Sequence, residues 1–195
     1  MSQTPLAAIS MLNDELITDC GAAQVKLASE ISAIKAGEFK TTELSLADIL
    51  DAYPVAKLRP LIEWAKEDKD CRFIYIFTVK TEKDPALLLQ CFTAVKRHHK
   101  EAKSTRMFAR PNQPSTNLYV GSSASLESRI KQHLGYRDKT LYSMQLCHWL
   151  EQGSIDSITL KVWKFPSTIP QTVLQAIEDH LWLKAQPMLG KQGGK

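Results

Sequence analysis

Three runs of apolar and β-branched residues in the second part of the chain have the pattern of β-strands. RFIYIFTVK (72–80) is aromatic and β-branched over most of its length, which predicts a buried strand. NLYVG (117–121) is a shorter run of the same kind. In SITLKVWKF (157–165), the apolar residues Ile158 and Leu160 alternate with polar ones, as in a strand that is buried on one face.

Helical periodicity separates these strands. DPALLLQCFTAVKRHHKEA offers Asp84 as the N-cap and Pro85 in the first turn, and its basic end suits a helix C-terminus. Three further helices are predicted, over residues 123–134, 140–151 and 171–185. Gly135 provides a stop for the first of them. The order of elements predicts an α/β (α+β) fold, with a small three-stranded sheet covered by helices.

The first 70 residues are expected to form a separate helical region. Apolar residues recur at helical spacing in short segments, and three helices are predicted: within 22–37, from Thr41 or Thr42 to Pro54, and within 58–67. The stretch KEDKD (66–70) cannot pack into a core, so it marks the expected boundary. A second domain is therefore expected over residues 71–195.

The composition is that of a soluble globular protein, with 44% hydrophobic and 24% charged residues among 195. No apolar run approaches the roughly 18 residues of a membrane span, and MSQTPLAAISML lacks the basic start of a secretion signal. We therefore expect a cytoplasmic protein without a membrane partner. The four cysteines are widely spaced and show no zinc-ligand pattern.

Charge is divided unevenly along the chain. Residues 1–70 contain 7 Lys and Arg against 12 Asp and Glu, whereas residues 71–195 contain 18 against 9. An excess of cations in the second part is typical of a protein that meets a polyanion. A basic surface that is merely well solvated would have the same composition.

A few polar residues stand where chemistry could be carried out. Glu178 shares a face of its predicted helix with Leu174 and Leu181, so its carboxylate requires a partner or a metal ion unless it reaches water at the edge of the apolar stripe. Arg129 and His133 lie one helical turn apart and suit a phosphate, although such a pair can also be a solvated surface. Two strand tyrosines, Tyr75 and Tyr119, could equally be packing residues.

Taken together, these five residues resemble the pattern of the GIY-YIG nucleases. FIY supplies Tyr75, YVG supplies Tyr119, Arg129 follows ten residues later and His133 four after that. Glu178 precedes KAQPMLGK, which is similar to the ending of the family. The resemblance covers roughly residues 72–192.

The chain departs from the family pattern in several places. Phe73 replaces the first glycine of the first motif, Ser122 stands where some members have Lys, and Gly190 stands where many have Asn. The two tyrosines are 44 residues apart, because a helix and loop of about residues 80–116 are inserted between the strands. A surface insertion of this kind costs little closure entropy.

The resemblance implies a metal-dependent DNA endonuclease. Glu178 would bind Mg²⁺ or Mn²⁺, and Arg129 would stabilise the charge that builds on the scissile phosphate. Tyr75 is favoured as the general base, with His133 relaying the proton and Tyr119 orienting water or phosphate; the reversed assignment of the tyrosines remains open.

Contacts with the DNA backbone are expected outside the catalytic residues. The candidates are Ser122 and a basic cluster in the insertion, namely Lys96, Arg97, Lys100, Lys103, Arg106 and Arg110. Two alternatives to catalysis stay open. One is a nucleic-acid-binding module that has lost activity, and the other is an interaction protein whose acidic first 70 residues dock on a basic partner or cover its own basic face. The sequence gives no indication of the oligomeric state.

Overall fold

The computed structural model describes residues 14–35, 37–151 and 154–193, which form two compact units divided after Lys35. The first unit contains helix α1 (Asp14–Ala33), which carries Asp14 and Glu15 in its first turn. Acidic residues stabilise a helix at this position, because its N-terminus is the positive end of the helix dipole. None of the residues of α1 is buried within the structure. The helix confirms the helical pattern predicted within residues 22–37.

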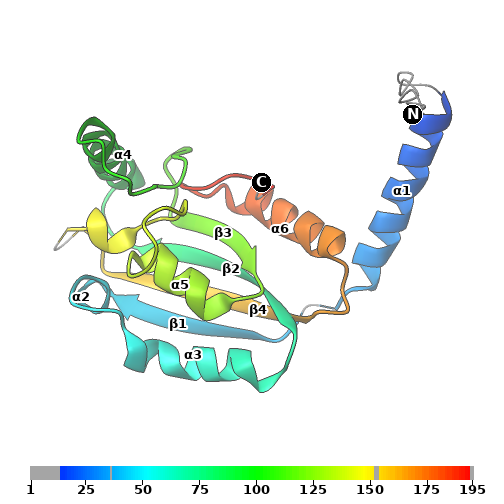
Figure 1. Cartoon of the computed structure of the whole chain (residues 1–195), viewed down its shortest axis with the longest axis horizontal. Coiled ribbons are helices and arrows are strands. Elements are labelled where there is room, and N and C mark those ends of the chain that lie inside the picture. Colours follow the sequence, from blue (N-terminus) through cyan, green and yellow to red (C-terminus); the bar gives the residue numbers. More distant parts are fainter. Residues whose placement is uncertain (1–13, 36, 152–153, 194–195) are drawn as a thin grey trace, which may run out of the picture. The chain divides into compact units, whose positions relative to one another are not determined.

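The second unit is built on a four-stranded antiparallel sheet (Figure 1). Its strands are β1 (Phe39–Ser45), β2 (Cys71–Lys80), β3 (Asn117–Ser123) and β4 (Ser157–Pro166), in the order β1-β4-β2-β3. The three strands predicted from the sequence are β2, β3 and β4. The mixed α/β class is confirmed, but the prediction of three strands is wrong, because β1 adds a fourth next to β4.

Strand β1 occupies a segment that was predicted to begin a helix at Thr41 or Thr42. It pairs with β4 over its whole length, from Phe39 opposite Trp163 to Ser45 opposite Ser157. A helix does follow, but it begins only at α2 (Leu46–Leu50), where Ser45 and Asp48 form a reciprocal capping box. Pairing with a strand more than 100 residues away decided the conformation here, which local periodicity cannot show.

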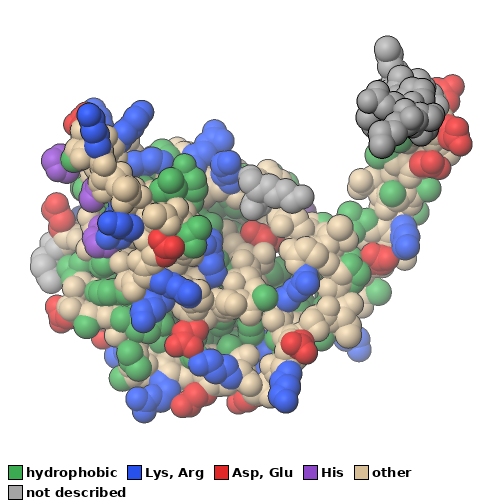
Figure 2. Space-filling model, in the orientation of Figure 1, with side chains coloured by type: hydrophobic (Ala, Val, Ile, Leu, Met, Phe, Trp, Pro, Cys, Tyr) green, Lys and Arg blue, Asp and Glu red, His purple; other side chains and the backbone are tan. Residues whose placement is uncertain are grey.

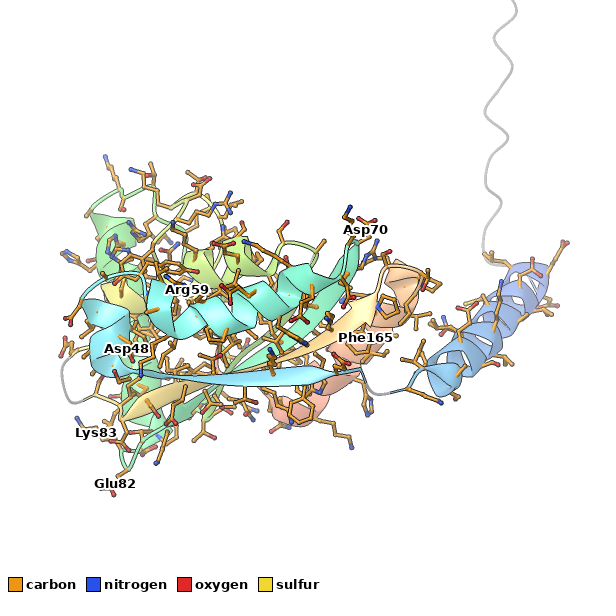
Figure 3. The ribbon with its side chains drawn as sticks, turned by 90° about the horizontal axis from the view of Figure 1, so that it is seen from below. Asp48, Arg59, Asp70, Glu82, Lys83 and Phe165 are labelled. Carbon is orange, nitrogen blue, oxygen red and sulfur yellow. The ribbon has the colours of Figure 1, made fainter. Side chains whose placement is uncertain are left out.

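Residues 37–67 belong to the same compact unit as the rest of the sheet. Helices α2 and α3 (Val55–Glu67), which carry the labelled Asp48 and Arg59 in Figure 3, lie alongside β1. Trp64 of α3 packs against Phe73 of β2, with ring centroids 6.4 Å apart. The expected boundary near residue 70 is therefore not where the chain divides, since the described chain separates after Lys35.

The two faces of the sheet are covered by different helices. Tyr75 pairs with Gly121 and Phe77 with Tyr119 on the face that meets α5 (Leu126–Leu134). The intervening residues, such as Ser122, point to the other face, where α6 (Gln171–Ala185) packs on β3. Groups from α5 and α6 can therefore meet only around the edge of β3, which is the last strand of the sheet.

The insertion between β2 and β3 contains α4 (Pro85–Glu101), as predicted, and Asp84 accepts a hydrogen bond from the backbone of Ala86 at 2.8 Å. Phe92 of this helix contacts the ring of Phe108 within the insertion and the ring of Trp149 outside it, and the second contact attaches the helix to the body. The insertion is thus packed on the sheet domain.

The helix predicted over residues 140–151 is not formed. Only a single 3-10 turn, Leu146–His148, interrupts an irregular segment, and Gln145 before it has a left-handed φ of 56°. The hydroxyl of Ser143 donates to the carbonyl of Gln132 on α5. This polar side chain therefore binds the end of α5 and does not take part in a helix of its own segment. No helix in the described part of the chain is long and apolar enough to cross a membrane.

Candidate active site

Two tyrosines face each other across β2 and β3 because the residue beside them is glycine. The rings of Tyr75 and Tyr119 are stacked, with centroids 6.5 Å apart and planes 12° from parallel. A Cβ atom on Gly121 would lie 2.8 Å from the Tyr75 hydroxyl and 2.9 Å from Cε1 of Tyr119. The glycine of the YVG motif therefore makes room for the tyrosine pair.

The C-terminal tail closes the other side of Tyr119. Leu189 donates its backbone N–H to the carbonyl of Leu118 at 2.9 Å, which ties the tail to β3. Gly190 follows with φ of 110°, and a Cβ there would lie 2.9 Å from Cε2 of Tyr119. Only glycine adopts this backbone conformation readily, and only glycine leaves space for the ring. The tail thus fixes the position of Tyr119.

Helix α5 places His133 directly behind the tyrosines. His133 is fully buried, its Nε2 lies 3.1 Å from the Tyr75 hydroxyl, and its ring centroid lies 4.3 Å from that of Tyr119. The backbone N–H of Met144 donates to Nδ1 at 3.4 Å, so we assign the ring hydrogen to Nε2. Burial, reinforced by the charge of Arg129, holds the pKa of His133 well below its usual value. A neutral His133 therefore donates to Tyr75.

Arg129 lies one turn earlier on α5 and supplies the positive charge of the site. Its guanidinium donates to the side-chain oxygen of Gln132. Because Gln132 is almost wholly buried, this hydrogen bond orients the guanidinium of Arg129. Burial raises the pKa of Tyr75 and of Tyr119, and the charge of Arg129 opposes that rise in both. Arg129 therefore favours the phenolate form of both tyrosines.

Glu178 reaches the same place from α6 on the opposite face of the sheet. It is 6% exposed, and its Oε2 accepts a hydrogen bond of 2.6 Å from the hydroxyl of Ser122. Burial raises the pKa of Glu178, while the hydrogen bond from Ser122 and the charge of Arg129 oppose the rise. A carboxylate in these surroundings would gain from a nearby cation.

These groups line one cleft of about 580 Å³. Its wall includes Tyr75, Tyr119, Arg129 and Glu178, while His133 lies behind the tyrosines. Four of the five residues singled out from the sequence thus meet around the edge of β3, and the fifth supports them. The other lining residues are Lys96, Ala109, Arg110, Gly121, Ser122, Tyr142, Gln171, Gln175, Gly190 and Lys191.

The residues predicted to contact nucleic acid are placed in different surroundings. Ser122, Lys96 and Arg110 line the cleft, although Lys96 is tied by a 2.7 Å hydrogen bond to the carbonyl of Ala109, and burial lowers its pKa.

The remaining predicted contacts lie outside the cleft. Arg106 donates to the side chain of Gln145, whereas Arg97 and Lys100 are exposed on α4. Figure 2 shows Lys and Arg side chains gathered over α4 and the loops beside it. Of the predicted cluster, only Lys96 and Arg110 line the cleft.

The sequence did not single out several residues of the cleft wall. Tyr142 was assigned to a helix that does not form, and its apolar neighbours gave no sign of a cleft. Lys191 belongs to the KAQPMLGK ending, but only the pairing of the tail with β3 brings it to the site. Nothing in the sequence pointed to Gln132, because it acts only by accepting a hydrogen bond from Arg129 on the same helix.

The site could hold a hard divalent cation through a single protein carboxylate. Among the described residues, no group of three or more His, Cys, Asp or Glu is placed to hold a metal ion together. Mg²⁺ and Mn²⁺ suit such a site, because they are bound by one or two carboxylates with water and substrate phosphate completing the shell. The buried carboxylate of Glu178 on an open cleft fits this description.

Comparison of the chain with models of protein families, with curated proteins and with solved structures finds no match. The geometry and chemistry of the site therefore carry the proposal of a function.

Proposed function

We propose that this cleft hydrolyses phosphodiester bonds of DNA with a divalent cation, which makes the protein a metal-dependent endonuclease of the GIY-YIG type. The observation that carries the proposal is the meeting of Tyr75, Tyr119, Arg129 and Glu178 in one cleft. These residues come from four separate segments, so their proximity is not a consequence of local sequence. Two phenols, a guanidinium and a carboxylate are the groups that the resemblance requires.

The charges around the cleft favour a phosphate as the reacting group. Arg129 presents a planar fork of donors that suits phosphate oxygens, and Lys96, Arg110 and Lys191 add cationic groups along the wall. A transition state that gathers charge on phosphate oxygens is stabilised most by such preorganised donors. A polymeric anion would, in addition, contact the basic side chains beyond the cleft.

Glu178 is the residue that would hold Mg²⁺ or Mn²⁺, with Ser122 fixing the orientation of its carboxylate. When bound, the cation supplies Lewis-acid stabilisation of the phosphate charge. Glu178 and Arg129 then act on the phosphate from opposite faces of the sheet, since one belongs to α6 and the other to α5. The phosphate lies between them at the edge of β3.

Tyr75, once it is a phenolate, is the residue that would accept the proton from the attacking water. Burial raises the pKa of Tyr75, and two groups oppose that effect by favouring the phenolate: the Nε2–H of His133, which donates to the oxygen, and the charge of Arg129. His133 is thus a donor that stabilises Tyr75, whereas the sequence-based expectation had it relay the proton. Tyr119, which is partly exposed, orients the water or the phosphate.

Separate removal of the two hydroxyls tests the assignment of the tyrosines. Tyr75→Phe is expected to reduce kcat by about 10²–10⁴-fold, the usual contribution of a general base, and Tyr119→Phe is expected to have a smaller effect. Both substitutions keep the ring, so the stacked pair remains in place. A larger loss in Tyr119→Phe would reverse the assignment.

The function itself is tested by nicking of supercoiled plasmid in the presence of Mg²⁺. We expect nicking by the wild type and none by Glu178→Gln. Glu127→Gln is the matched control, because Glu127 is exposed, lies outside the cleft and forms a surface ion pair with Lys66, so this variant should nick normally. If the wild type binds DNA but does not nick it, the chain is a nucleic-acid-binding module without this activity.

A further inference from the structure

Tyr142 is an aromatic side chain that lies at the rim of the cleft and has no role in the proposed chemistry. Its side chain is 66% exposed, and it lines the cleft together with Arg129 and Glu178. An exposed aromatic ring beside cationic side chains is complementary to a ligand that is both planar and negatively charged. A nucleotide has both properties.

The backbone around Tyr142 is held in place by the insertion. Met107 donates its N–H to the carbonyl of Lys139 at 2.7 Å, and Ala109 donates to the carbonyl of Ser143 at 2.8 Å. Phe108 and Ser143 form an isolated parallel bridge at the second of these bonds. Tyr142 therefore lies between two points, Lys139 and Ser143, at which its segment is bonded to the insertion, so its position relative to the cleft is set by the fold.

Cationic groups lie along the same wall. Arg110 is exposed and follows directly after Ala109, which is bonded to Ser143, the residue next to Tyr142. The backbone N–H of Gly190 donates to the carbonyl of Arg110 at 2.8 Å, which brings Lys191 to the cleft as well. An aromatic platform with cations beside it is the arrangement by which proteins bind single-stranded nucleic acid.

The size of the cleft limits what can enter it. A volume of about 580 Å³ is in the range of pockets that take one small organic molecule. One or two nucleotides of a single strand fit this space. Both faces of a base inside a duplex are covered by its neighbours, so a base that stacks face to face on Tyr142 is unpaired.

We infer that Tyr142 stacks on an unpaired base of the strand whose phosphate meets Arg129, so that the cleft selects DNA that is single-stranded or frayed at the cut site. This inference rests on the proposed function, because it assigns the substrate class of the same cleft. Arg110 and Lys191 hold the phosphates that flank the stacked base.

The test measures binding without cleavage, in EDTA, by fluorescence anisotropy. The probes are a short labelled single-stranded oligonucleotide and the duplex that it forms with its complement. Tyr142→Ala is expected to weaken single-strand binding about ten-fold, the size of one stacking contact, and to change duplex binding little. Tyr142→Phe keeps the ring and should bind both probes as the wild type does.

Leu141→Ala is the matched control, because Leu141 is the adjacent residue, is 51% exposed and does not line the cleft. It should leave both affinities unchanged. A 2-aminopurine base placed in the single strand should lose fluorescence on binding to the wild type and retain it with Tyr142→Ala. Equal weakening of both probes by Tyr142→Ala, or no weakening, would overturn the inference.

The outcomes of this test and of the plasmid assay can be told apart. A wild type that cleaves neither the plasmid nor the labelled single-stranded oligonucleotide in Mg²⁺, but loses single-strand affinity in Tyr142→Ala, would refute the proposed catalysis and support stacking at Tyr142. A wild type that nicks in a Glu178-dependent manner, with single-strand affinity unchanged in Tyr142→Ala, would support the catalysis and refute the stacking.

Discussion

Glu178 carries a cost in stability that its proposed role explains. The carboxylate is 6% exposed, and a hydrogen bond from Ser122 satisfies one of its oxygens. Burying a charged group without full compensation destabilises the folded state, and functional sites commonly accept this. The same carboxylate is placed to gain when a cation binds.

Replacing Glu178 by Gln should therefore stabilise the protein in the absence of metal. We expect an increase of about 1 kcal/mol in the free energy of unfolding at neutral pH, because the amide removes the buried charge and can still bond to Ser122. Urea unfolding in EDTA measures the difference. A clear loss of stability would mean that the ionised carboxylate already has its partners in the metal-free protein.

Gly121 should tolerate no side chain, since a Cβ there would come within 3 Å of both active-site tyrosines. We expect Gly121→Ala to cost about 1–3 kcal/mol in the free energy of unfolding, as overpacking of a core does, and to reduce nicking. Gly21→Ala is the control, because nothing lies within 4 Å of that position. Unchanged stability in Gly121→Ala would show that the tyrosines are not packed as described.

His133 should make stability depend on pH in a defined direction. Its pKa is lowered in the folded protein, so the unfolded chain takes up a proton as the pH falls below about 6.5 while the folded protein does not. The stability that His133 contributes is present above that pH and is lost below it, by up to about 1.4 kcal/mol per pH unit.

Thermal unfolding of the wild type and of His133→Gln across this range measures the effect. The difference in the free energy of unfolding between the two proteins should narrow as the pH falls, because the wild type alone loses the contribution of His133. The other histidines titrate in both proteins and cancel from the difference. A gap that widens at low pH would mean that His133 is protonated in the folded protein.

At the scale of elements, the insertion and the tail hold the site together. Asn112 donates its side-chain N–H groups to the carbonyls of Pro187 at 3.0 Å and Gly190 at 3.1 Å. Its backbone N–H also donates to the carbonyl of Met188 at 2.8 Å. The insertion thereby fixes the tail that packs on Tyr119, which explains why so long an insertion is compatible with the site.

Asn112→Ala should loosen this connection without touching the cleft directly. We expect a loss of about 1–3 kcal/mol in the free energy of unfolding, since two carbonyls lose their donors, together with a reduced nicking rate. Gln113→Ala is the neighbouring control, because Gln113 is exposed and bonds only to the side chain of Gln186. Equal effects of the two substitutions would contradict a special role for Asn112.

The sequence predicted those elements whose signals are local. The Asp84 cap of α4 and the alternation in β4 were enough to place them, and Gly135 ends α5 in the left-handed conformation expected of it. Strand β1 was missed because its partner lies more than 100 residues away. The segment around Gln145 was predicted as a helix because its apolar residues recur at a suitable spacing, whereas its polar groups bind α5.

The candidate site could be predicted only as a set of residue types. Spacing pointed to Arg129 and His133 because both lie on one helix, and to Tyr119 because it precedes them closely. Tyr142 and Asn112 gave no local signal, since their positions depend on pairing between the insertion, the tail and a distant loop. The direction of the hydrogen bond from His133 to Tyr75 likewise depends on the backbone of Met144.

At the scale of the whole molecule, the chain divides after Lys35, and the cleft belongs entirely to the second unit. A chain of residues 36–195 should therefore unfold cooperatively and nick plasmid as the full chain does. A chain of residues 71–195 should not fold, because it lacks β1 and the buried residues of α3. Circular dichroism and the nicking assay check both. A folded, active 71–195 chain would restore the boundary expected from the sequence.

We propose that Glu178 and Arg129 hold a cation and a phosphate between them at the edge of β3. A crystal structure of the protein with Mn²⁺ and a short single-stranded oligonucleotide is the decisive measurement. We expect an anomalous Mn²⁺ peak about 2 Å from a carboxylate oxygen of Glu178, with a phosphate bound to the guanidinium of Arg129. Mn²⁺ bound away from Glu178, or a phosphate bound only by the basic residues of α4, would contradict it.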